Sequence, residues 1–444
     1  MKISIPDKAK QVISGLEAAG FEAYVVGGCV RDACLGREAA DWDITTDALP
    51  GEVKSIFPKT VDTGIQHGTV TVIIGGEGFE VTTYRVDGEY HDGRHPESVT
   101  FTRSLKEDLK RRDFTINAMA YNDTAGLVDI FGGLGDLGDK KIRCVGDPKE
   151  RFDEDALRIM RAVRFAAQLG FEIEEETYQA LSEFAPRLAL VSVERIQVEL
   201  VKLLVSPHPD YVRLLWKSGI TAVILPEFDA CMDTPQNNPH HCYSVGEHIL
   251  HSLTEIPAEK HLRTTMLLHD IGKPACKTTD AQGVDHFKKH AAVGSDMADG
   301  ILRRLKFDND TRKKVVRLVR SHDDLHDVPT KKAVRRAVNR IGTDLFPDYI
   351  LVRRADIMAQ SPAFRDSKLQ NLEILKSLYA RIIEDGECVE LKSLAVKGQD
   401  LIDLGFTPGP EIGEMLDRLL EKVLEHPEYN RKDILLNKAL QMKV

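Results

Sequence analysis

The sequence predicts an α+β protein in which a mixed-sheet head is followed by an all-helical remainder. Up to about residue 145, β-type runs such as AYVVGG, TVTVIIGG, EGFEVTTYRV and GLVDIFGG alternate with Gly-rich turns. From about Asp147 onward the strand signal fades, and apolar residues recur at helical spacing, as in ALRIMRAVRFAAQL and ERIQVELVKLLV. A chain of 444 residues is too long for one core, so it should divide into several packed units.

Composition predicts a cytoplasmic protein without a membrane span. The first thirty residues lack the basic start and apolar run of a signal peptide, and no stretch reaches about 18 apolar residues. The 7 cysteines are odd in number and contain no C-x-x-C pair, so we expect them to be reduced and mostly buried. They are Cys29, Cys34, Cys144, Cys231, Cys242, Cys276 and Cys388.

The net charge of −10 argues against a nucleic-acid-binding protein, because phosphate contacts need clustered Lys and Arg. Local basic runs nevertheless occur at 110–112, along 158–164 and between Arg312 and Arg340. Each run alone is more often a solvated helix face than a binding site.

The segment VVGGCVRDACLGREAADWDITTDA carries the sharpest local pattern. Gly27 and Gly28 separate a predicted strand from a predicted helix, so backbone N–H groups can approach phosphate without a Cβ in the way. Asp41 and Asp43 are two residues apart and would share one face of a strand. Neighbouring carboxylates repel unless a cation lies between them, and Mg²⁺ is the expected cation for phosphoryl transfer.

G-G-x-V-R-D followed by D-W-D-I closely resembles the head of class II tRNA nucleotidyltransferases and of bacterial poly(A) polymerases. The resemblance implies a nucleotidyltransferase-type mixed sheet, with Asp41 and Asp43 binding catalytic Mg²⁺ and Gly28 and Arg31 at the nucleotide. A third carboxylate on a neighbouring strand usually completes such a site, and Glu80 is the candidate. Glu80 could instead be an outward-facing strand residue.

The segment RRDFTINAMAYN matches the next motif of this family, which recognises ribose and triphosphate. Asp113 can accept from a ribose hydroxyl, while Arg111, Arg112 and Asn117 can donate toward phosphate oxygens. The alternative is a basic helix start with Asp113 at its positive end. Between the motifs, RVDGEYHDGRHPESVTFT resembles the flexible loop that the family needs for terminal A addition.

Asp155 and Arg158 suggest how C and A could be chosen without a template, because they are three residues apart on a predicted helix. A carboxylate that only accepts and a guanidinium that only donates complement the pairing edges of cytosine and adenine. Uracil and guanine would mismatch both groups, at roughly 1–3 kcal/mol for each unmatched group. The alternative is a surface salt bridge between Asp155 and Arg158.

The E-D-x-x-R motif follows the head motifs at the family's usual position, and the resemblance therefore assigns Asp155 and Arg158 as base readers. It implies that Glu154 orients the arginine and that Arg161 and Arg164 also serve nucleotide binding. The later segment VSVERIQVELVKLL, with Glu194, Arg195 and Glu199, should brace the base-reading helix.

A second set of motifs lies in residues 236–360, where a His-Asp pair in LLHDIGKP is accompanied by further histidines. The order of these residues resembles the HD phosphohydrolase pattern. The resemblance implies hydrolysis of phosphate esters by metal-bound water, with Lys273 near phosphate and with Mn, Ni, Co, Fe or Mg as the metal. His240, His241 and His251 are expected to be bystanders. The implied ligands are His248, His269, Asp270 and Asp356, with His290 and His322 as ligands of a second metal.

Together the resemblances cover nearly the whole chain and imply a protein that adds C, C and A to tRNA from CTP and ATP. An enzyme that adds only A, a poly(A) polymerase, and an RNA-binding HD hydrolase that does not polymerise remain alternatives. The sequence does not determine the oligomeric state. The implied domains are a head at 1–145, a helical neck at 146–225, an HD body at 226–360 and a tRNA-contacting helical tail at 361–444.

Overall fold

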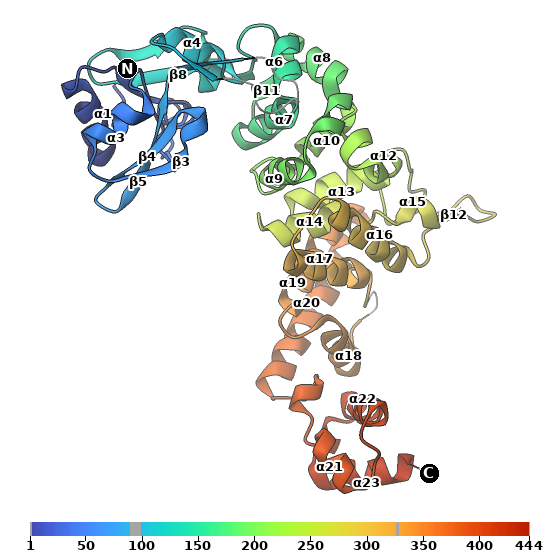
Figure 1. Ribbon diagram of the computed structural model, residues 1–444. Helices are drawn as coiled ribbons and strands as arrows, with labels where there is room; N and C mark the ends of the chain where they lie inside the picture. Colours follow the sequence, from blue (N-terminus) through green and yellow to red (C-terminus); the bar gives the residue numbers. More distant parts are fainter. Residues whose placement is uncertain (1, 89–98, 326–327, 444) are drawn as a thin grey trace. The chain divides into compact units, whose positions relative to one another are not determined.

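The computed structural model describes residues 2–88, 99–325 and 328–443, which form two compact units (Figure 1). The division falls between Pro226 and Glu227, at the predicted start of the HD body. The finer boundaries at 145 and 360 stay predictions. Most of the segment predicted to serve A addition, residues 89–98, lies outside the described residues. No helix of the described ranges is both long and apolar enough to cross a membrane.

A seven-stranded mixed sheet forms the head of the first unit. Within it, β2 and β5 run parallel, and the register pairs Ile44 with Val81. Asp43, immediately before β2, is therefore a neighbour of Glu80, which lies within β5 one residue before Val81. The strand order is β3 (Thr60–Gly64), β4 (Thr69–Ile74), β5 (Glu77–Thr83), β2 (Ile44–Thr46), β1 (Ala23–Val26), β8 (Met119–Asn122) and β9 (Gly126–Asp129).

Helices α1 (Asp7–Ala18) and α3 (Pro50–Ile56) pack against each other and against this sheet (Figure 1). Helix α1 buries Ala9, Val12, Ile13 and Leu16, the spacing of a single apolar helix face. The two helices thereby cover strands β1, β2, β4 and β5.

The rest of the first unit is largely helical, with α4 (Leu105–Lys110), α6 (Pro148–Glu154), α7 (Leu157–Leu169) and α9 (Val193–Leu204) around the site. Helices α7 and α9 pack on each other, and α7 is buried along most of its length. The predicted α+β class is confirmed. Two short strand pairs add to the helical remainder, β10 (Lys141–Ile142) with β11 (Glu172–Ile173), and β12 (Thr278–Thr279) with β13 (Asp285–His286).

The second unit is built on a group of packed helices from which the predicted metal ligands project. Helix α14 contacts α13, α17 and α19, and α17 contacts α16. Helix α20 (Pro362–Glu384) packs on α18 (Lys331–Ile341) and α19, and α22 (Pro410–Glu425) begins at a proline, a residue favoured in the first helical turn. The central helices are α13 (Val245–Thr254), α14 (Lys260–Leu268), α16 (His290–Arg304), α17 (Asn309–Ser321) and α19 (Phe346–Met358).

Candidate active sites

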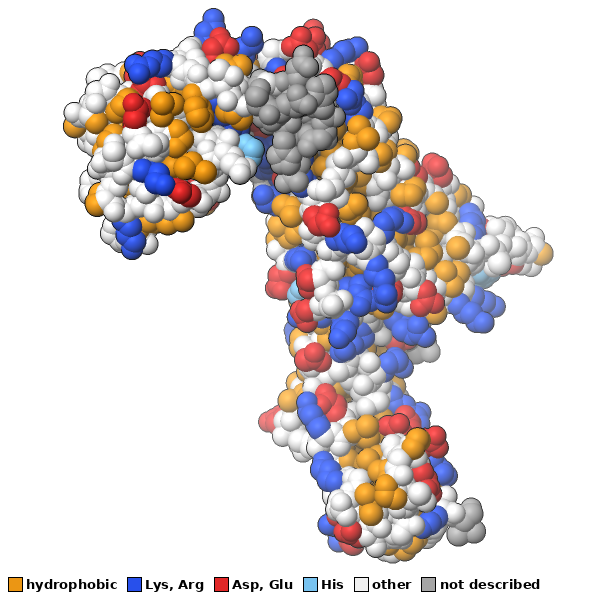
Figure 2. Space-filling model, in the orientation of Figure 1, with side chains coloured by type: hydrophobic (Ala, Val, Ile, Leu, Met, Phe, Trp, Pro, Cys, Tyr) orange, Lys and Arg blue, Asp and Glu red, His pale blue; other side chains and the backbone are white. Residues whose placement is uncertain are grey.

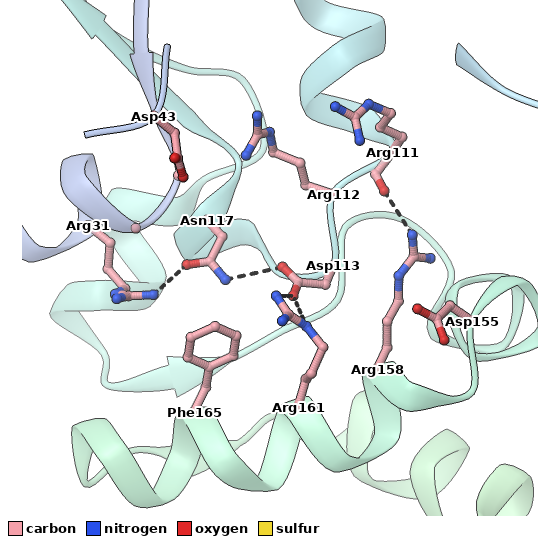
Figure 3. Close-up of a pocket in the computed structure, with 12 residues that line it drawn as sticks. Arg31, Asp43, Arg111, Arg112, Asp113, Asn117, Asp155, Arg158, Arg161 and Phe165 are labelled. Carbon is pink, nitrogen blue, oxygen red and sulfur yellow. Dashed lines mark hydrogen bonds and ion pairs between the residues drawn. The ribbon is translucent and has the colours of Figure 1, made fainter. Parts of the chain in front are cut away.

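A cavity of about 450 Å³ in the first unit brings together most of the residues that the head and neck motifs single out (Figure 3). Three predicted site residues, Asp41, Glu80 and Arg164, are not among those that line it. The lining residues are Gly27, Gly28, Arg31, Asp43, Arg111, Arg112, Asp113, Asn117, Asp155, Arg158, Arg161 and Phe165.

The paired aspartates lie just before β2 rather than within it, since that strand begins at Ile44. The premise that Asp41 and Asp43 share a strand face is therefore wrong. The Asp43 carbonyl nevertheless accepts a hydrogen bond of 3.0 Å from the Val26 N–H, which continues the ladder with β1. Both aspartate side chains are exposed.

Electrostatics link Asp43 to Glu80 and Asp41. Although Asp43 is exposed, partial loss of hydration and the Glu80 carboxylate raise its pKa, with Asp41 adding to the effect and Arg112 opposing it. A carboxylate whose ionisation is opposed by two neighbouring carboxylates suits a divalent cation. The three carboxylates do not form a closed ligand set, because among the described residues the groups with all ligand atoms within 4.8 Å lie in the second unit.

Asp108, which the motif analysis missed, holds two arginines at the cavity. It is completely buried and receives Arg111 Nη2 at 2.8 Å, Arg112 Nη2 at 3.4 Å and the Thr45 hydroxyl at 3.1 Å. Burial opposes ionisation of Asp108, but Arg112 and Arg111 outweigh it and lower its pKa. The i, i+3, i+4 spacing in DLKRR was the signal that could have revealed it.

A chain of hydrogen bonds crosses the floor of the cavity (Figure 3). Arg31 Nη1 donates to Asn117 Oδ1 at 2.7 Å, Asn117 Nδ2 to Asp113 Oδ1 at 3.1 Å, and Arg161 Nε to Asp113 Oδ2 at 2.8 Å. Burial opposes ionisation of Asp113, but Arg161 and the hydrogen bonds lower its pKa to about 2. Asp113 is thus an ionised anchor that orients Asn117 and Arg161.

Phe165 on α7 is a second residue that the motifs did not reveal. Its ring lies 5.2 Å from the Arg31 guanidinium carbon and 5.3 Å from that of Arg161, and it provides a planar surface in the cavity. Arg164 stacks on the same ring at 3.6 Å and pairs with buried Glu199 at 2.7 Å. The structure therefore places Arg164 in the packing of α7 on α9.

Asp155 and Arg158 do not share one helix, so this part of the base-reading argument is wrong. Asp155 ends α6 with an extended backbone, φ −139°, and α7 begins at Leu157. The Asp155 Oδ1 accepts from the Leu157 N–H at 3.0 Å, and Oδ2 accepts from Arg195 Nη2 at 2.8 Å. Asp155 caps the start of α7 while Arg195 of α9 braces it.

Arg158 still lines the same cavity, and several acceptors fix its guanidinium. Its Nη1 donates to the Arg151 carbonyl at 3.0 Å and to Glu154, and its Nη2 donates to the Arg111 carbonyl at 3.0 Å. Glu154 therefore lies where the orienting role predicted for it requires.

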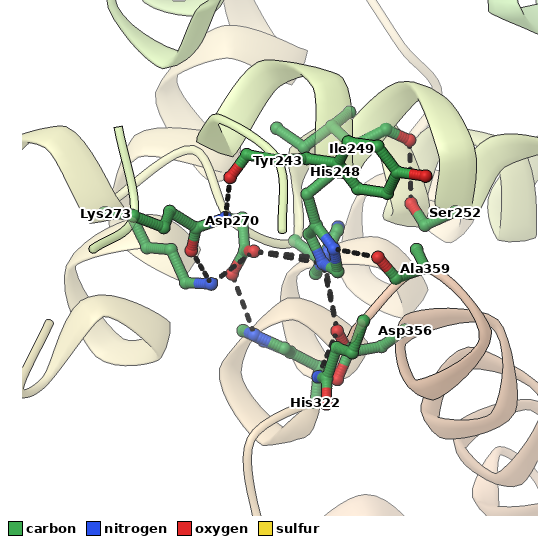
Figure 4. A network of polar contacts seen from close by, with 12 residues as sticks. Tyr243, His248, Ile249, Ser252, Asp270, Lys273, His322, Asp356 and Ala359 are labelled. Carbon is green, nitrogen blue, oxygen red and sulfur yellow. Dashed lines mark hydrogen bonds and ion pairs between the residues drawn. The ribbon is translucent and has the colours of Figure 1, made fainter. Parts of the chain in front are cut away.

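The second unit gathers the six predicted HD residues into two buried groups (Figure 4). In each group all the ligand atoms lie within 4.8 Å of one another. Asp270 stands between them, with Oδ2 at 3.4 Å from His248 Nε2 and Oδ1 at 3.4 Å from His322 Nε2. The groups are His248, His269 and Asp356, and Asp270, His290 and His322.

Backbone carbonyls fix the orientation of all four histidines. The Nδ1 atoms of His248, His269, His290 and His322 lie 3.2, 2.8, 2.8 and 2.7 Å from the carbonyls of Ala359, Met266, Phe287 and Val319. With a proton on Nδ1, each Nε2 lone pair faces the cluster, where the Nε2 atoms of His248 and His269 are 3.2 Å apart. Burial lowers the pKa of His290 against the opposing effect of Asp270, which favours the neutral, metal-binding imidazole.

Lys273, predicted to contact phosphate, lies against the cluster. Its Nζ is 2.7 Å from Asp270 Oδ2 and donates to Gln236 Oε1 at 2.9 Å. Lys273 is buried, and its amine lies beside the carboxylate that joins the two groups.

Comparison with known proteins identifies three family models that match separate stretches of the chain. A family model of the poly A polymerase head domain matches residues 23–143, one of an RNA- and SrmB-binding site of polymerase A matches 170–232, and one of tRNA nucleotidyltransferase domain 2 matches 287–439.

Relatives extend along the full chain. The CCA-adding enzyme of Lactiplantibacillus plantarum is 36% identical over 435 residues, covering 97% of this chain and 95% of that protein. The CCA-adding enzyme of Enterococcus faecalis is 35% identical over 456 residues, covering 100% and 98%. The crystal structure of the Bacillus stearothermophilus CCA-adding enzyme in complex with CTP is 32% identical, with a TM-score of 0.74 and coverage of 98% and 97%. The chain belongs to the family of CCA-adding enzymes, the class II tRNA nucleotidyltransferases.

Proposed function

We propose that this protein adds C, C and A to the 3′ end of tRNA from CTP and ATP without a nucleic-acid template. The observation that carries the proposal is the 450 Å³ cavity, in which Asp43, a set of arginines and the Asp155–Arg158 region face one volume. Metal-binding, phosphate-binding and base-reading groups are thus within reach of one bound nucleotide. Family membership supports the same activity. We infer that the protein acts in the cytoplasm, where tRNA, CTP and ATP occur together.

Asp41, Asp43 and Glu80 would hold Mg²⁺, since their mutual repulsion favours a cation and carboxylates are its usual protein ligands. Bound there, Mg²⁺ supplies activation of the tRNA 3′-hydroxyl and charge neutralisation on the triphosphate. Arg111 and Arg112, held by Asp108, donate to phosphate oxygens. Arg31 and Arg161 flank the Phe165 ring and hold the nucleotide at the opposite side of the cavity.

Nucleotide choice rests on Arg158 and Asp155 as two separately braced groups. Glu154 and the carbonyls of Arg151 and Arg111 fix the guanidinium, while Arg195 and the start of α7 fix the carboxylate. Rigid placement matters because a mismatched base is rejected only if the reading groups cannot move to accommodate it.

An extension assay tests this function. Purified protein is incubated with labelled CTP or ATP and tRNA ending before CCA, after CC or after CCA. We expect CMP incorporation into the first, a single AMP into the second and none into the third. A single A added without prior C addition would indicate an A-adding enzyme, and a long A tail would indicate a poly(A) polymerase.

We propose a second activity, metal-dependent hydrolysis of phosphate esters, at the histidine cluster. The observation that favours it is a ligand set with four Nε2 lone pairs converging on carboxylates in a buried site. The imidazoles favour Ni, Co or Fe over Mg, and the carboxylates of Asp270 and Asp356 make the site suitable for Mn as well. A divalent ion there supplies Lewis-acid polarisation of the ester and of an attacking water, while Lys273 adds a fixed positive charge.

Release of p-nitrophenol from p-nitrophenyl phosphate, measured with each metal, tests the second activity. A protein that hydrolyses this ester but never extends tRNA would match the remaining alternative, an RNA-binding HD hydrolase without polymerising activity.

The two basic helices, α17 and α18, differ in how closely their Lys and Arg side chains pair with carboxylates. On the face shown in Figure 2, Lys and Arg side chains gather over α17, where Lys313, Arg317 and Arg320 are exposed. The two exposed arginines of α17 lie 3.7 Å (Arg317–Asp344) and 4.0 Å (Arg320–Asp296) from carboxylates. On α18 the charges form closer ion pairs with the same unit, as in Arg335–Glu387 at 2.9 Å. We therefore assign tRNA phosphate contacts to α17 rather than to the whole run from Arg312 to Arg340.

A further inference from the structure

A cavity of about 400 Å³ lies beside the histidine cluster, and none of the steps above uses it. Two of its lining residues, Arg353 and Ile357, flank the ligand Asp356 on α19, and a third, Asp323, follows the ligand His322. A fourth, His241, has its ring centre 5.2 Å from that of the ligand His248. The cavity therefore borders the cluster through three different segments.

Two cationic side chains of the cavity wall are connected by hydrogen bonds to the predicted metal ligands. Lys368 on α20 donates to the Gln360 side-chain oxygen, and Gln360 Nε2 donates to Asp356 Oδ1 at 2.9 Å. Arg353 Nη1 donates to the His322 carbonyl at 2.7 Å and lies 3.7 Å from Asp356 Oδ2. Lys368 and Arg353 thus face a volume next to the metal ligands, against one lining carboxylate, Asp323.

The remaining lining combines an unsatisfied polar atom with an apolar wall. The Nδ1 of His241, a residue that its sequence context marked as a bystander, is buried and has no hydrogen-bond partner within the protein. This nitrogen is therefore available to a polar group of a molecule bound in the cavity. Leu372 and Leu375 of α20 supply buried apolar surface for an organic group.

We propose that this cavity binds the substrate of the hydrolytic site. The substrate is a phosphate ester of about one nucleotide in size, with its phosphate at Lys368 and Arg353 and its organic group against Leu372 and Leu375. The inference rests on the proposed hydrolase function and adds α20 to that site. The volume is that of an ordinary small-molecule pocket, and cations fixed beside the metal ligands suit a phosphate that must reach the metals.

The test compares Lys368→Met with a matched variant of the same helix in the full-length, Mn²⁺-loaded protein. We expect Lys368→Met to raise KM for p-nitrophenyl phosphate about tenfold while kcat changes far less, because a charged phosphate contact is lost and the ligands remain. Lys368→Arg should recover most of the affinity. Lys376→Met removes an exposed charge of α20 that pairs with Glu373 and should leave both constants unchanged.

Binding of the non-hydrolysable p-nitrophenyl phosphonate, measured by calorimetry, separates the two proposals. If the wild-type protein hydrolyses the ester and Lys368→Met has an unchanged KM, the pocket assignment is wrong and the hydrolase stands. If the wild type hydrolyses nothing with any metal yet binds the phosphonate in a Lys368-dependent manner, the hydrolase is wrong and the pocket stands. Absence of binding as well would overturn both.

Discussion

The carboxylate cavity of the first unit and the histidine cluster of the second are both assigned divalent metals, but they differ in how complete the ligand set is. The histidine cluster is buried, its four imidazoles are oriented by carbonyls, and its ligand atoms lie within 4.8 Å. Asp41, Asp43 and Glu80 are exposed and converge only loosely. A preassembled set retains a metal by itself, whereas Mg²⁺ at a few carboxylates also needs substrate phosphate.

The largest expected effect is a loss of hydrolysis at the histidine cluster without any change in nucleotide addition at the first site. Asp270→Asn removes the charge that joins the two ligand groups, so we expect hydrolysis to fall on the order of 10³-fold or more and the bound metal to fall with it. Addition of C and A should be unchanged. Kinetics and metal analysis by mass spectrometry measure both effects, and His251→Asn, beside Tyr243, is the control. Loss of nucleotide addition in Asp270→Asn would contradict independent sites.

Nucleotide choice should depend on how firmly Arg158 is held. Arg158→Met removes the donor, so the preference for CTP over UTP should fall about 10- to 100-fold, the equivalent of roughly 1–3 kcal/mol. The ratio of kcat/KM values for the two nucleotides measures it. Arg187→Met, which removes an exposed charge paired with Asp153, is the control. An unchanged ratio would exclude Arg158 as a base reader.

The separation into a carboxylate site in the first unit and a histidine site in the second could largely be predicted from the sequence. Glycine, carboxylate and histidine motifs indicate chemistry through residue type and order. The seven-stranded sheet was only partly predictable. Strand β8 is buried at every position, so its sequence lacks the alternation that marks half-buried strands.

The break between α6 and α7 was missed for another reason. No Gly or Pro separates Glu154 from Leu157, and the apolar spacing runs through the break. The interruption comes from the Asp155 carboxylate, which caps α7 and is held by Arg195, 40 residues further along the chain. A contact between residues so far apart in the sequence leaves no pattern in the local sequence. The same is true of the packing of Phe165 against Arg31 and Arg161.

A smaller effect should follow from Asp108, which orients arginines without lining the cavity. Asp108→Asn weakens the hold on Arg111 and Arg112, so KM for both CTP and ATP should rise about tenfold with nucleotide preference retained. Steady-state kinetics measure this effect. Glu107→Gln, the neighbouring residue on α4, serves as the matched control. A change in preference rather than in KM would assign Asp108 to base reading instead.

The last effect concerns the pH dependence of stability and leaves activity between pH 5 and 8 unchanged. The pKa of Asp113 is lowered to about 2 from 3.8, so its ionised form stabilises the folded state by about 2 kcal/mol above pH 4, and this contribution is lost as pH falls toward 2. Between pH 5 and 8 Asp113 should not titrate. Hydrogen exchange along α7 at pH 7 and at pH 3 measures the loss, which Asp113→Asn should lack. Equal pH dependence in both proteins would contradict the Asp113–Arg161 anchor.

We propose that Asp41 and Asp43, the acidic pair before β2, support attack of a tRNA hydroxyl on a nucleoside triphosphate. The most direct test of this proposal is single-turnover incorporation of CMP into tRNA lacking CCA, in Mg²⁺, by a protein carrying Asp41→Asn and Asp43→Asn. We predict a rate lower by on the order of 10³-fold or more, with tRNA binding intact. Incorporation at the wild-type rate would contradict the account.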